Sequence, residues 1–342
     1  MMKKLKFVAV PVFLAALALV IIFSIPKQYE VAPFKERPGT EYWQLTTGSK
    51  IGYTKIAANS PEQKAPLIYL HGGPGGKITD DVIAALSPLS QAGHDVYVND
   101  QIGSGHSARL PAIADYSVER HREDLRAIVA EIGADKVILI GHSWGACLAT
   151  NYLQEYPTTV EKIILTGPGP ILPMSRRLAD VPAPDSLQLI EPEYSNQDGN
   201  KQAYSWRSRA VLKWAQLFSA KLVPDEEADD FFTFLNQALS QSTYCTIGEA
   251  KKYTGGGGYY SHVMTMKSIN NVADGRERLQ ELDTPMLILR GQCDNQKWGY
   301  VQEYLDLFQN AKLEIITGVG HDIVGKDKEA YYRLLSQFLA EE

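Results

Sequence analysis

Cysteine is scarce in this sequence of 342 residues, which contains only Cys147, Cys245 and Cys293. Three cysteines are too few for a disulfide scaffold, and their spacing matches no metal-ligand motif. We therefore predict no metal site and interpret the three as small buried residues. A bond between Cys147 and Cys293 would require both to lie near the functional site, which the sequence alone does not establish.

The sequence also lacks a block of basic residues beyond its first few positions, and its formal net charge is −6. Because a nucleic-acid binder needs a basic face, we expect no nucleic-acid partner. Hydrophobic residues make up 44% and charged residues 22%, close to the averages of soluble globular proteins. The length suits one large α/β domain with an inserted subdomain, or two small domains.

Long apolar runs are absent except at the N-terminus, where Phe7–Ile25 is almost unbroken and Pro26 ends it. A helix of about 19 residues spans roughly 28 Å, nearly the thickness of the bilayer core. We interpret residues 1–27 as an uncleaved signal anchor that crosses the membrane through residues 7–25. Lysines before the run favour a cytoplasmic N-terminus, which places the rest of the chain on the outer, extracytoplasmic side. The alternative is a cleaved signal peptide and a secreted protein, although no small-x-small cleavage site is present.

Short runs rich in β-branched and aromatic residues predict eight strands, the first two of which form a hairpin and the rest buried parallel strands. The predicted strands are Glu41–Thr46, Lys50–Ala57, Pro66–Leu70, Asp95–Val98, Lys136–Ile140, Lys162–Thr166, Pro285–Leu289 and Leu313–Ile316. The helices predicted between and after them are Asp80–Ala92, Ser117–Ile132, Trp144–Glu155, Lys297–Leu307 and Lys328–Glu341.

The alternation of strands and helices stops between about Ile171 and Ala273. This segment contains proline-rich stretches, the amphipathic helices Ala203–Phe218 and Glu226–Leu239, and then four consecutive glycines. We predict a mainly helical cap over residues 171–273, inserted after the sixth main strand. The α/β core then consists of residues 28–170 and 274–342.

Gly141-His142-Ser143-Trp144-Gly145 follows a predicted strand and leads into the helix that begins near Trp144. In a nucleophile elbow, small residues flank a sharp, strained turn, so that the serine hydroxyl projects above the sheet near a helix N-terminus. Gly-x-Ser-x-Gly alone is a weak signal. With a strand before it and a helix after it, the motif predicts Ser143 as the nucleophile of an α/β-hydrolase fold, with a mostly parallel sheet flanked by helices.

A serine nucleophile needs a base, and in α/β-hydrolases the chain order is serine, acid, histidine. Asp294 follows the strand Pro285–Leu289, and His321 follows the last predicted strand. We predict that His321 takes the serine proton and that Asp294 fixes the imidazole tautomer. Asp322 is the rival acid, but a side chain adjacent to the base normally points away. Four other histidines lack this placement and are interpreted as structural or pocket-lining: His71, His106, His142 and His262.

The oxyanion formed at the attacked carbonyl must be met by preorganised N–H donors. His71-Gly72-Gly73-Pro74-Gly75-Gly76 follows the strand Pro66–Leu70, where an α/β-hydrolase places its oxyanion loop. We predict the backbone N–H groups of Gly73 and Trp144 as the oxyanion hole.

Together with Asp100-Gln101-Ile102-Gly103-Ser104-Gly105-His106-Ser107, the glycine loop and the nucleophile elbow resemble the prolyl aminopeptidase (proline iminopeptidase) family of α/β-hydrolases. The resemblance covers roughly residues 40–342 and is weakest in the cap. It implies a cleft between core and cap, no metal or organic cofactor, and release of the N-terminal residue from short peptides or amides. Carried over by position, the triad of the family falls on Ser143, Asp294 and His321.

The chain departs from the family pattern in two places. Ile102 replaces the arginine of the Asp-Gln-Arg-Gly segment, and the cap tryptophans are followed by Arg207 and Ala215 rather than by the amine-binding glutamate. A buried ammonium without a carboxylate partner costs several kcal/mol. Five glutamates remain candidates for that role: Glu191, Glu193, Glu226, Glu227 and Glu249.

The sequence thus predicts a serine hydrolase that cleaves an amide or ester through an acyl-enzyme on Ser143, with a small molecule or short peptide as substrate. The first hypothesis is an aminopeptidase-like enzyme. The alternatives are a carboxylesterase, lactonase or other amidase of the same fold, and more remotely a catalytically silent binding protein.

Overall fold

The computed structural model describes residues 14, 17 and 21–341. Within these residues, one sheet has the strand order β1-β2-β4-β3-β5-β6-β7-β8. Its strands are β1 (Glu41–Gln44), β2 (Lys50–Ile56), β3 (Lys64–Leu70), β4 (His94–Asn99), β5 (Val137–His142), β6 (Val160–Thr166), β7 (Met286–Gly291) and β8 (Ala311–Ile316). The β1–β2 and β2–β4 pairs are antiparallel and all other pairs are parallel. All eight predicted strands are therefore present, with ends that shift by at most a few residues.

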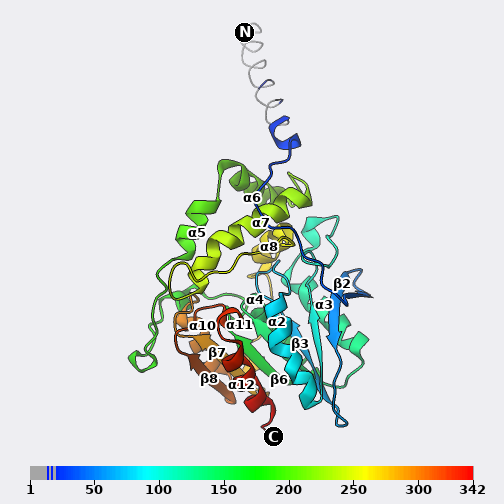
Figure 1. Cartoon of the computed structure of the whole chain (residues 1–342), viewed down its shortest axis with the longest axis vertical. Coiled ribbons are helices and arrows are strands. Elements are labelled where there is room, and N and C mark those ends of the chain that lie inside the picture. The colour runs from blue at the N-terminus through cyan, green and yellow to red at the C-terminus, as the bar shows by residue number, and fades with distance from the viewer. Residues whose placement is uncertain (1–13, 15–16, 18–20, 342) are drawn as a thin grey trace.

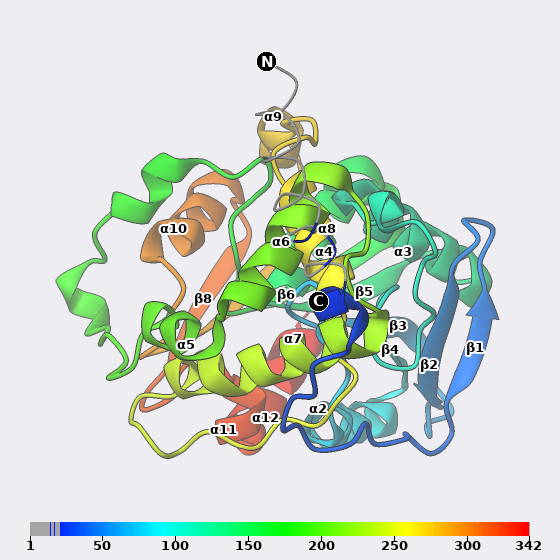
Figure 2. The same cartoon turned by 90° about the horizontal axis from the view of Figure 1, so that it is seen from above.

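Helices cover both faces of the sheet (Figures 1 and 2). One face carries α2 (Asp80–Leu86), α11 (Ile323–Lys326) and α12 (Lys328–Leu339), and the other carries α3 (Val118–Ile132), α4 (Trp144–Glu155) and α10 (Trp298–Leu307). Side chains alternate between the two faces along each strand. Along β5, Ile138 and Ile140 join the core under α2 and α12, whereas Leu139 joins the core under α3 and α4.

The segment between β6 and β7 is helical and lies over one edge of the sheet (Figure 1). It contains α5 (Asn196–Ala203), α6 (Trp206–Phe218), α7 (Asp225–Leu239) and α8 (Tyr259–Ser268), followed by the short α9 (Arg276–Gln280). The predicted helix Ala203–Phe218 is shorter than expected, because α5 ends at Ala203 and the Ser205 side chain caps a new helix at the backbone N–H of Ser208.

The four consecutive glycines, residues 255–258, pass directly over the loops of the core. The N–H of Gly258 donates to the carbonyl of Gly75 at 2.8 Å, and the N–H of Gly105 donates to the carbonyl of Gly256 at 2.8 Å. A Cβ on Gly258 would overlap the backbone carbonyl of Gly103. A side chain is therefore excluded at Gly258, where this segment crosses the glycine loop after β3.

The predicted membrane-spanning segment, residues 7–25, falls mostly outside the described residues. In the part of the chain that the structure describes, no helix is both long enough and apolar enough to cross a membrane. Residues 21–24 are helical, and the chain then runs along the cap toward β1 (Figure 1). The signal anchor stays a prediction.

Candidate active site

Ser143 lies at the turn between β5 and α4, with backbone angles φ 54° and ψ −114°. Few non-glycine residues adopt positive φ, and such strained positions cluster at functional sites. The flanking glycines are required sterically: a Cβ on Gly145 would overlap the carbonyl of Leu70, and one on Gly141 would overlap the backbone of Gly145. The strain is thus confined to the residue whose hydroxyl must project from the turn.

Asp294 and His321 form a buried pair at the carboxyl ends of β7 and β8. The Nδ1 atom of His321 lies 2.9 Å from Oδ1 of Asp294, which also accepts a hydrogen bond from the N–H of Gln296 at 2.8 Å. Burial raises the pKa of Asp294, but His321 and Arg290 outweigh burial and hold this pKa at about 2. The carboxylate is therefore charged at neutral pH and fixes the imidazole with its proton on Nδ1 and Nε2 free to accept one.

The rival acid, Asp322, is engaged elsewhere. Its carboxylate accepts a hydrogen bond from the Tyr244 hydroxyl at 2.6 Å and one from the N–H of Gly325 at 2.9 Å. It thereby caps the N-terminus of α11. The geometry assigns Asp322 a structural role.

Two glycines lie against the three predicted catalytic residues. A Cβ on Gly72 would lie 3.2 Å from Cβ of Ser143, and one on Gly167 would lie 2.7 Å from Nδ1 of His321 and 2.8 Å from Oδ2 of Asp294. The Ser143 hydroxyl makes no hydrogen bond within the described residues, and such bonds often tighten only when substrate binds. Sequence reasoning missed Gly167, although a Gly-Pro-Gly run directly after β6 marks the same edge of the sheet.

Replacing Gly167 by alanine is expected to lower kcat at least roughly tenfold, because the new methyl group must displace the acid–histidine pair and small misplacements are costly. Gly133→Ala is the matched control. Gly133 also has positive φ, at 72°, but a Cβ there meets nothing within 4 Å. Both variants therefore carry the same kind of backbone strain, and only one touches the site. Steady-state kinetics and thermal melting of the two proteins check this, and equal kcat values would contradict the placement of Gly167.

The predicted oxyanion donors flank the serine. Trp144 is the first residue of α4, so its N–H has no intrahelical carbonyl partner. Neither this N–H nor that of Gly73 donates to a backbone carbonyl in the described part of the chain. Gly73 has φ 124°, and a Cβ there would collide with the backbone of Gly75 and Gly76. Both amides thus remain available to a ligand.

Of the remaining histidines, His71 joins two loops and His142 lies beside His321. The N–H of Gln101 donates to Nε2 of His71 at 2.9 Å, so Nδ1 of His71 carries the proton that reaches the carbonyl of Gly72. The Gln101 side chain in turn accepts from Nε1 of Trp144 at 2.8 Å. The ring of His142 lies 4.8 Å from that of His321, and burial together with His321 lowers the pKa of His142 to about 4. His142 therefore stays neutral beside His321.

The segment after β4 is organised around the buried carboxylate of Asp100. Its partners are Arg37 at 3.1 Å, Nδ1 of His106 at 3.0 Å and the N–H of Ile78 at 2.7 Å. Burial raises the pKa of Asp100, but His106 and Arg37 outweigh it and lower this pKa. The guanidinium that Asp100 contacts comes from residue 37, while Ile102 packs in the core.

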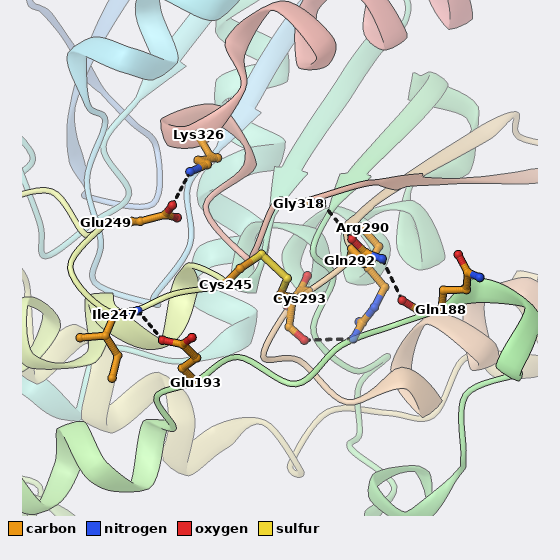
Figure 3. The surroundings of a disulfide bond; sticks show 11 residues. Gln188, Glu193, Cys245, Ile247, Glu249, Arg290, Gln292, Cys293, Gly318 and Lys326 are labelled. Carbon is orange, nitrogen blue, oxygen red and sulfur yellow. Dashed lines mark hydrogen bonds and ion pairs between the residues drawn. A yellow bond between two sulfur atoms is a disulfide. The ribbon is translucent and has the colours of Figure 1, made fainter.

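The cysteine prediction was wrong for Cys245 and Cys293, which form a disulfide between the cap and the loop after β7 (Figure 3). It was right for Cys147, which is buried and unpaired. The sequence offered no spacing that pairs a cap loop with the loop after β7. Because Cys293 immediately precedes Asp294, the disulfide links the cap covalently to the loop that carries Asp294.

Neighbouring contacts extend this link between cap and core. The Asn295 side chain donates to Ser242 at 3.0 Å, and the N–H of Asp322 donates to the carbonyl of Thr243 at 3.2 Å. Residues 242–245 of the cap thus contact both the loop after β7, which carries Asp294, and the loop after β8, which carries His321. The Glu249–Lys326 ion pair, at 2.8 Å, lies beside the disulfide (Figure 3).

A family described as alpha/beta hydrolase fold matches residues 65–325. Among solved structures, an esterase from Exiguobacterium antarcticum aligns with a TM-score of 0.59 and 17% identity, covering 88% of this chain and 99% of the esterase. The fold and the serine–histidine–aspartate arrangement therefore define an α/β-hydrolase, and the chain is a hydrolase.

Two curated relatives identify the family within the α/β-hydrolases. A proline iminopeptidase from Heyndrickxia coagulans is 32% identical over 316 residues, which cover 88% of this chain and 98% of the relative. A proline iminopeptidase from Saccharolobus solfataricus is 25% identical, with 80% and 84% covered. The chain thus belongs to the proline iminopeptidase-like family of α/β-hydrolases, as the motifs predicted. Within the described residues, no cluster of three or more His, Cys, Asp or Glu side chains could hold a metal ion.

Proposed function

We propose that this hydrolase cleaves an amide or ester bond through an acyl-enzyme on Ser143. The observation that supports this most directly is the 2.9 Å bond between ionised Asp294 and His321, at the same sheet edge as the strained Ser143 turn. This combination matches the serine–histidine–acid arrangement in residue type, chain order and fold position.

In the proposed reaction, Nε2 of His321 takes the proton of the Ser143 hydroxyl while Oγ attacks the substrate carbonyl. The negative charge that develops on the carbonyl oxygen is stabilised by the N–H groups of Gly73 and Trp144. The imidazolium then protonates the leaving amine or alcohol, and Asp294 stabilises the imidazolium. A water molecule, activated by His321, hydrolyses the acyl-enzyme and restores Ser143.

The relatives named proline iminopeptidase favour release of an N-terminal residue from a short peptide as the reaction. Such a substrate presents a free ammonium group, and its recognition inside a cleft requires a carboxylate. The specificity question is therefore whether the cap offers one.

The acids of the cap favour a second candidate, ester or amide hydrolysis without amine recognition. Glu227, which is buried, accepts two hydrogen bonds from Arg207, at 2.7 and 2.8 Å. Asp229 is paired with Arg109 at 2.9 Å, and Glu249 with Lys326 at 2.8 Å. The other three glutamates considered above are exposed: Glu191, Glu193 and Glu226.

Acetylation of the substrate amine tests this point. A bond between an ammonium and a carboxylate is worth about 1.5–3 kcal/mol, so an aminopeptidase should lose at least roughly ten- to hundredfold in kcat/KM on acetylation. Because Arg207 neutralises Glu227, we expect less than tenfold for this enzyme. The measurement compares free and acetylated anilides of alanine and proline, beside short-chain nitrophenyl esters.

A loss larger than tenfold would instead support the aminopeptidase and require an acid outside the pairs described above. Glu191→Gln and Glu226→Gln would then identify it, because the responsible variant alone would equalise the two substrates. Ser143→Ala, which should remove both activities, controls for background hydrolysis.

We also propose a membrane-anchored chain with its catalytic domain on the extracytoplasmic side. The apolar sequence of residues 7–25 supports the anchor. The Cys245–Cys293 disulfide supports the compartment, since disulfides persist in oxidising environments and are rare in the cytosol.

A further inference from the structure

The cap holds the end of the N-terminal segment with a buried ion pair. Arg207 at the start of α6 and Glu227 in α7 form two hydrogen bonds, and their side chains are only 8% and 3% exposed. The same guanidinium donates to the carbonyls of Ile22 at 2.6 Å and Ile25 at 2.9 Å. Arg207 directly follows Trp206, at the position where the family pattern has a glutamate. In this chain the arginine at that position holds the N-terminal segment against the cap.

These contacts fix the direction in which the N-terminal segment leaves the domain. The carbonyls at a helix C-terminus lack intrahelical partners, and Arg207 satisfies two of them at the end of residues 21–24. The N–H of Lys27 donates to Glu227 at 3.0 Å, and the Phe23 ring packs edge-on against Trp206 with centroids 5.9 Å apart. The segment is therefore attached to the cap and leaves it above α6 and α7 (Figure 1).

The helix that carries Arg207 also exposes large apolar side chains. Trp206 and Phe218 are each 61% exposed, Leu217 is 73% exposed and Trp214 is 40% exposed. At 100° per residue these four positions fall within one side of α6. Arg209 and Lys213 are exposed next to them on the same helix. An exposed face of Trp, Leu and Phe flanked by basic residues is typical of helices that lie in a membrane interface.

The apolar surface continues from α6 onto the N-terminal segment. Ile21, Ile22 and Ile25 are exposed there. A groove of about 480 Å³ separates the two parts, lined by Ile22, Ile25, Pro26, Lys27, Ser205, Trp206 and Arg207. From Ile25 back to Phe7 the sequence is apolar except for Ser24.

We propose that the exposed face of α6 rests on the lipid bilayer, with Trp206, Trp214, Leu217 and Phe218 at the boundary between headgroups and acyl chains. A bilayer suits this surface better than a second copy of the chain, because the surface is continuous with a segment whose sequence has the length and apolarity to cross a membrane. Arg209 and Lys213 are placed to contact anionic headgroups. The cap then sits against the membrane in one orientation instead of moving on a flexible tether.

This inference rests on the proposed membrane anchor and is independent of the chemistry at Ser143. The full-length protein is reconstituted into vesicles of phosphatidylcholine and phosphatidylglycerol, with ordinary or brominated acyl chains. Flotation of the vesicles after an alkaline wash tests the anchor alone. Tryptophan fluorescence tests the contact of α6, because bromine quenches only indoles at the depth of the acyl chains.

We expect brominated lipids to lower the emission of the α6 tryptophans relative to ordinary lipids, because a helix in the membrane interface buries its apolar face about 5–10 Å into the boundary between headgroups and acyl chains. The variant W206F/W214F should lose this difference, since Trp144 and Trp298 are buried in the core and Trp43 stacks on Tyr53 in the β1–β2 hairpin. Leu217→Glu with Phe218→Glu should also lose it. The matched control is Ile190→Glu with Ile247→Glu, which adds the same charges at exposed cap positions outside α6 and should leave quenching unchanged.

Flotation without quenching would overturn the inference while leaving the anchor intact. Failure to float would overturn both. A Leu217→Cys variant that forms a disulfide between two chains in the vesicles, without quenching of the α6 tryptophans, would show that a second copy covers this face.

Discussion

Replacement of Ser143 by alanine is expected to lower kcat by about 10⁶, the effect of removing the nucleophile from a well-studied serine protease. Without Oγ no acyl-enzyme can form, whereas the oxyanion donors of the site remain. The same variant should no longer react with a fluorophosphonate probe. Kinetics and labelling of the purified protein measure both effects.

Ser90→Ala serves as the control for this variant. Ser90 is buried like a core residue, but its hydroxyl bonds only to the carbonyl of Ser87 in a 3-10 helix remote from the elbow. Labelling and kcat should stay near the wild-type values. If Ser143→Ala kept a tenth of the activity, the nucleophile would have to be another residue.

The second large effect is expected for Asp294→Asn, with kcat lowered by about 10⁴ because an amide partner favours the wrong imidazole tautomer. The substituted amide has nearly the size of the carboxylate that it replaces, so the fold should persist. The measurement pairs kcat with thermal melting, which separates a chemical loss from unfolding.

Asp322→Asn separates the two neighbouring acids. Asp322 caps α11 and accepts from Tyr244, and asparagine keeps a side-chain oxygen that caps a helix about as well, so the replacement should cost less than about 1 kcal/mol of stability and change kcat little. A loss of activity in Asp322→Asn comparable to that of Asp294→Asn would contradict the choice of acid.

The sheet and the elbow could be predicted because local sequence carries their signals. Buried strands are continuous apolar runs, and the turn at Ser143 needs glycine on both sides for steric reasons that the sequence displays directly. Helix α4 has the predicted bounds Trp144–Glu155. In contrast, α8 was missed because most of its side chains are buried, so it lacks the polar face that marks an amphipathic helix.

The contacts between cap and core could not be predicted, because they join segments far apart in the chain. Glu227 was considered as an amine-binding acid, yet Arg207, twenty positions earlier, occupies its carboxylate. Cys293 forms its disulfide with Cys245 and not with Cys147, the partner considered from the sequence. Local patterns contain no information about which distant side chain will meet a given one.

The disulfide also bears on how the protein unfolds. Its cysteines are 48 positions apart, and the covalent ring that they close contains α8, α9 and β7. In the chain-entropy view, a ring of this size stabilises the folded state by about 4 kcal/mol, because it restricts the unfolded ensemble. Helices α8 and α9 and strand β7 therefore lie in one covalently closed ring, which restricts them together in the unfolded chain. In a reducing compartment the disulfide would be broken, and the folded state would lose this stabilisation in the segment that ends immediately before Asp294.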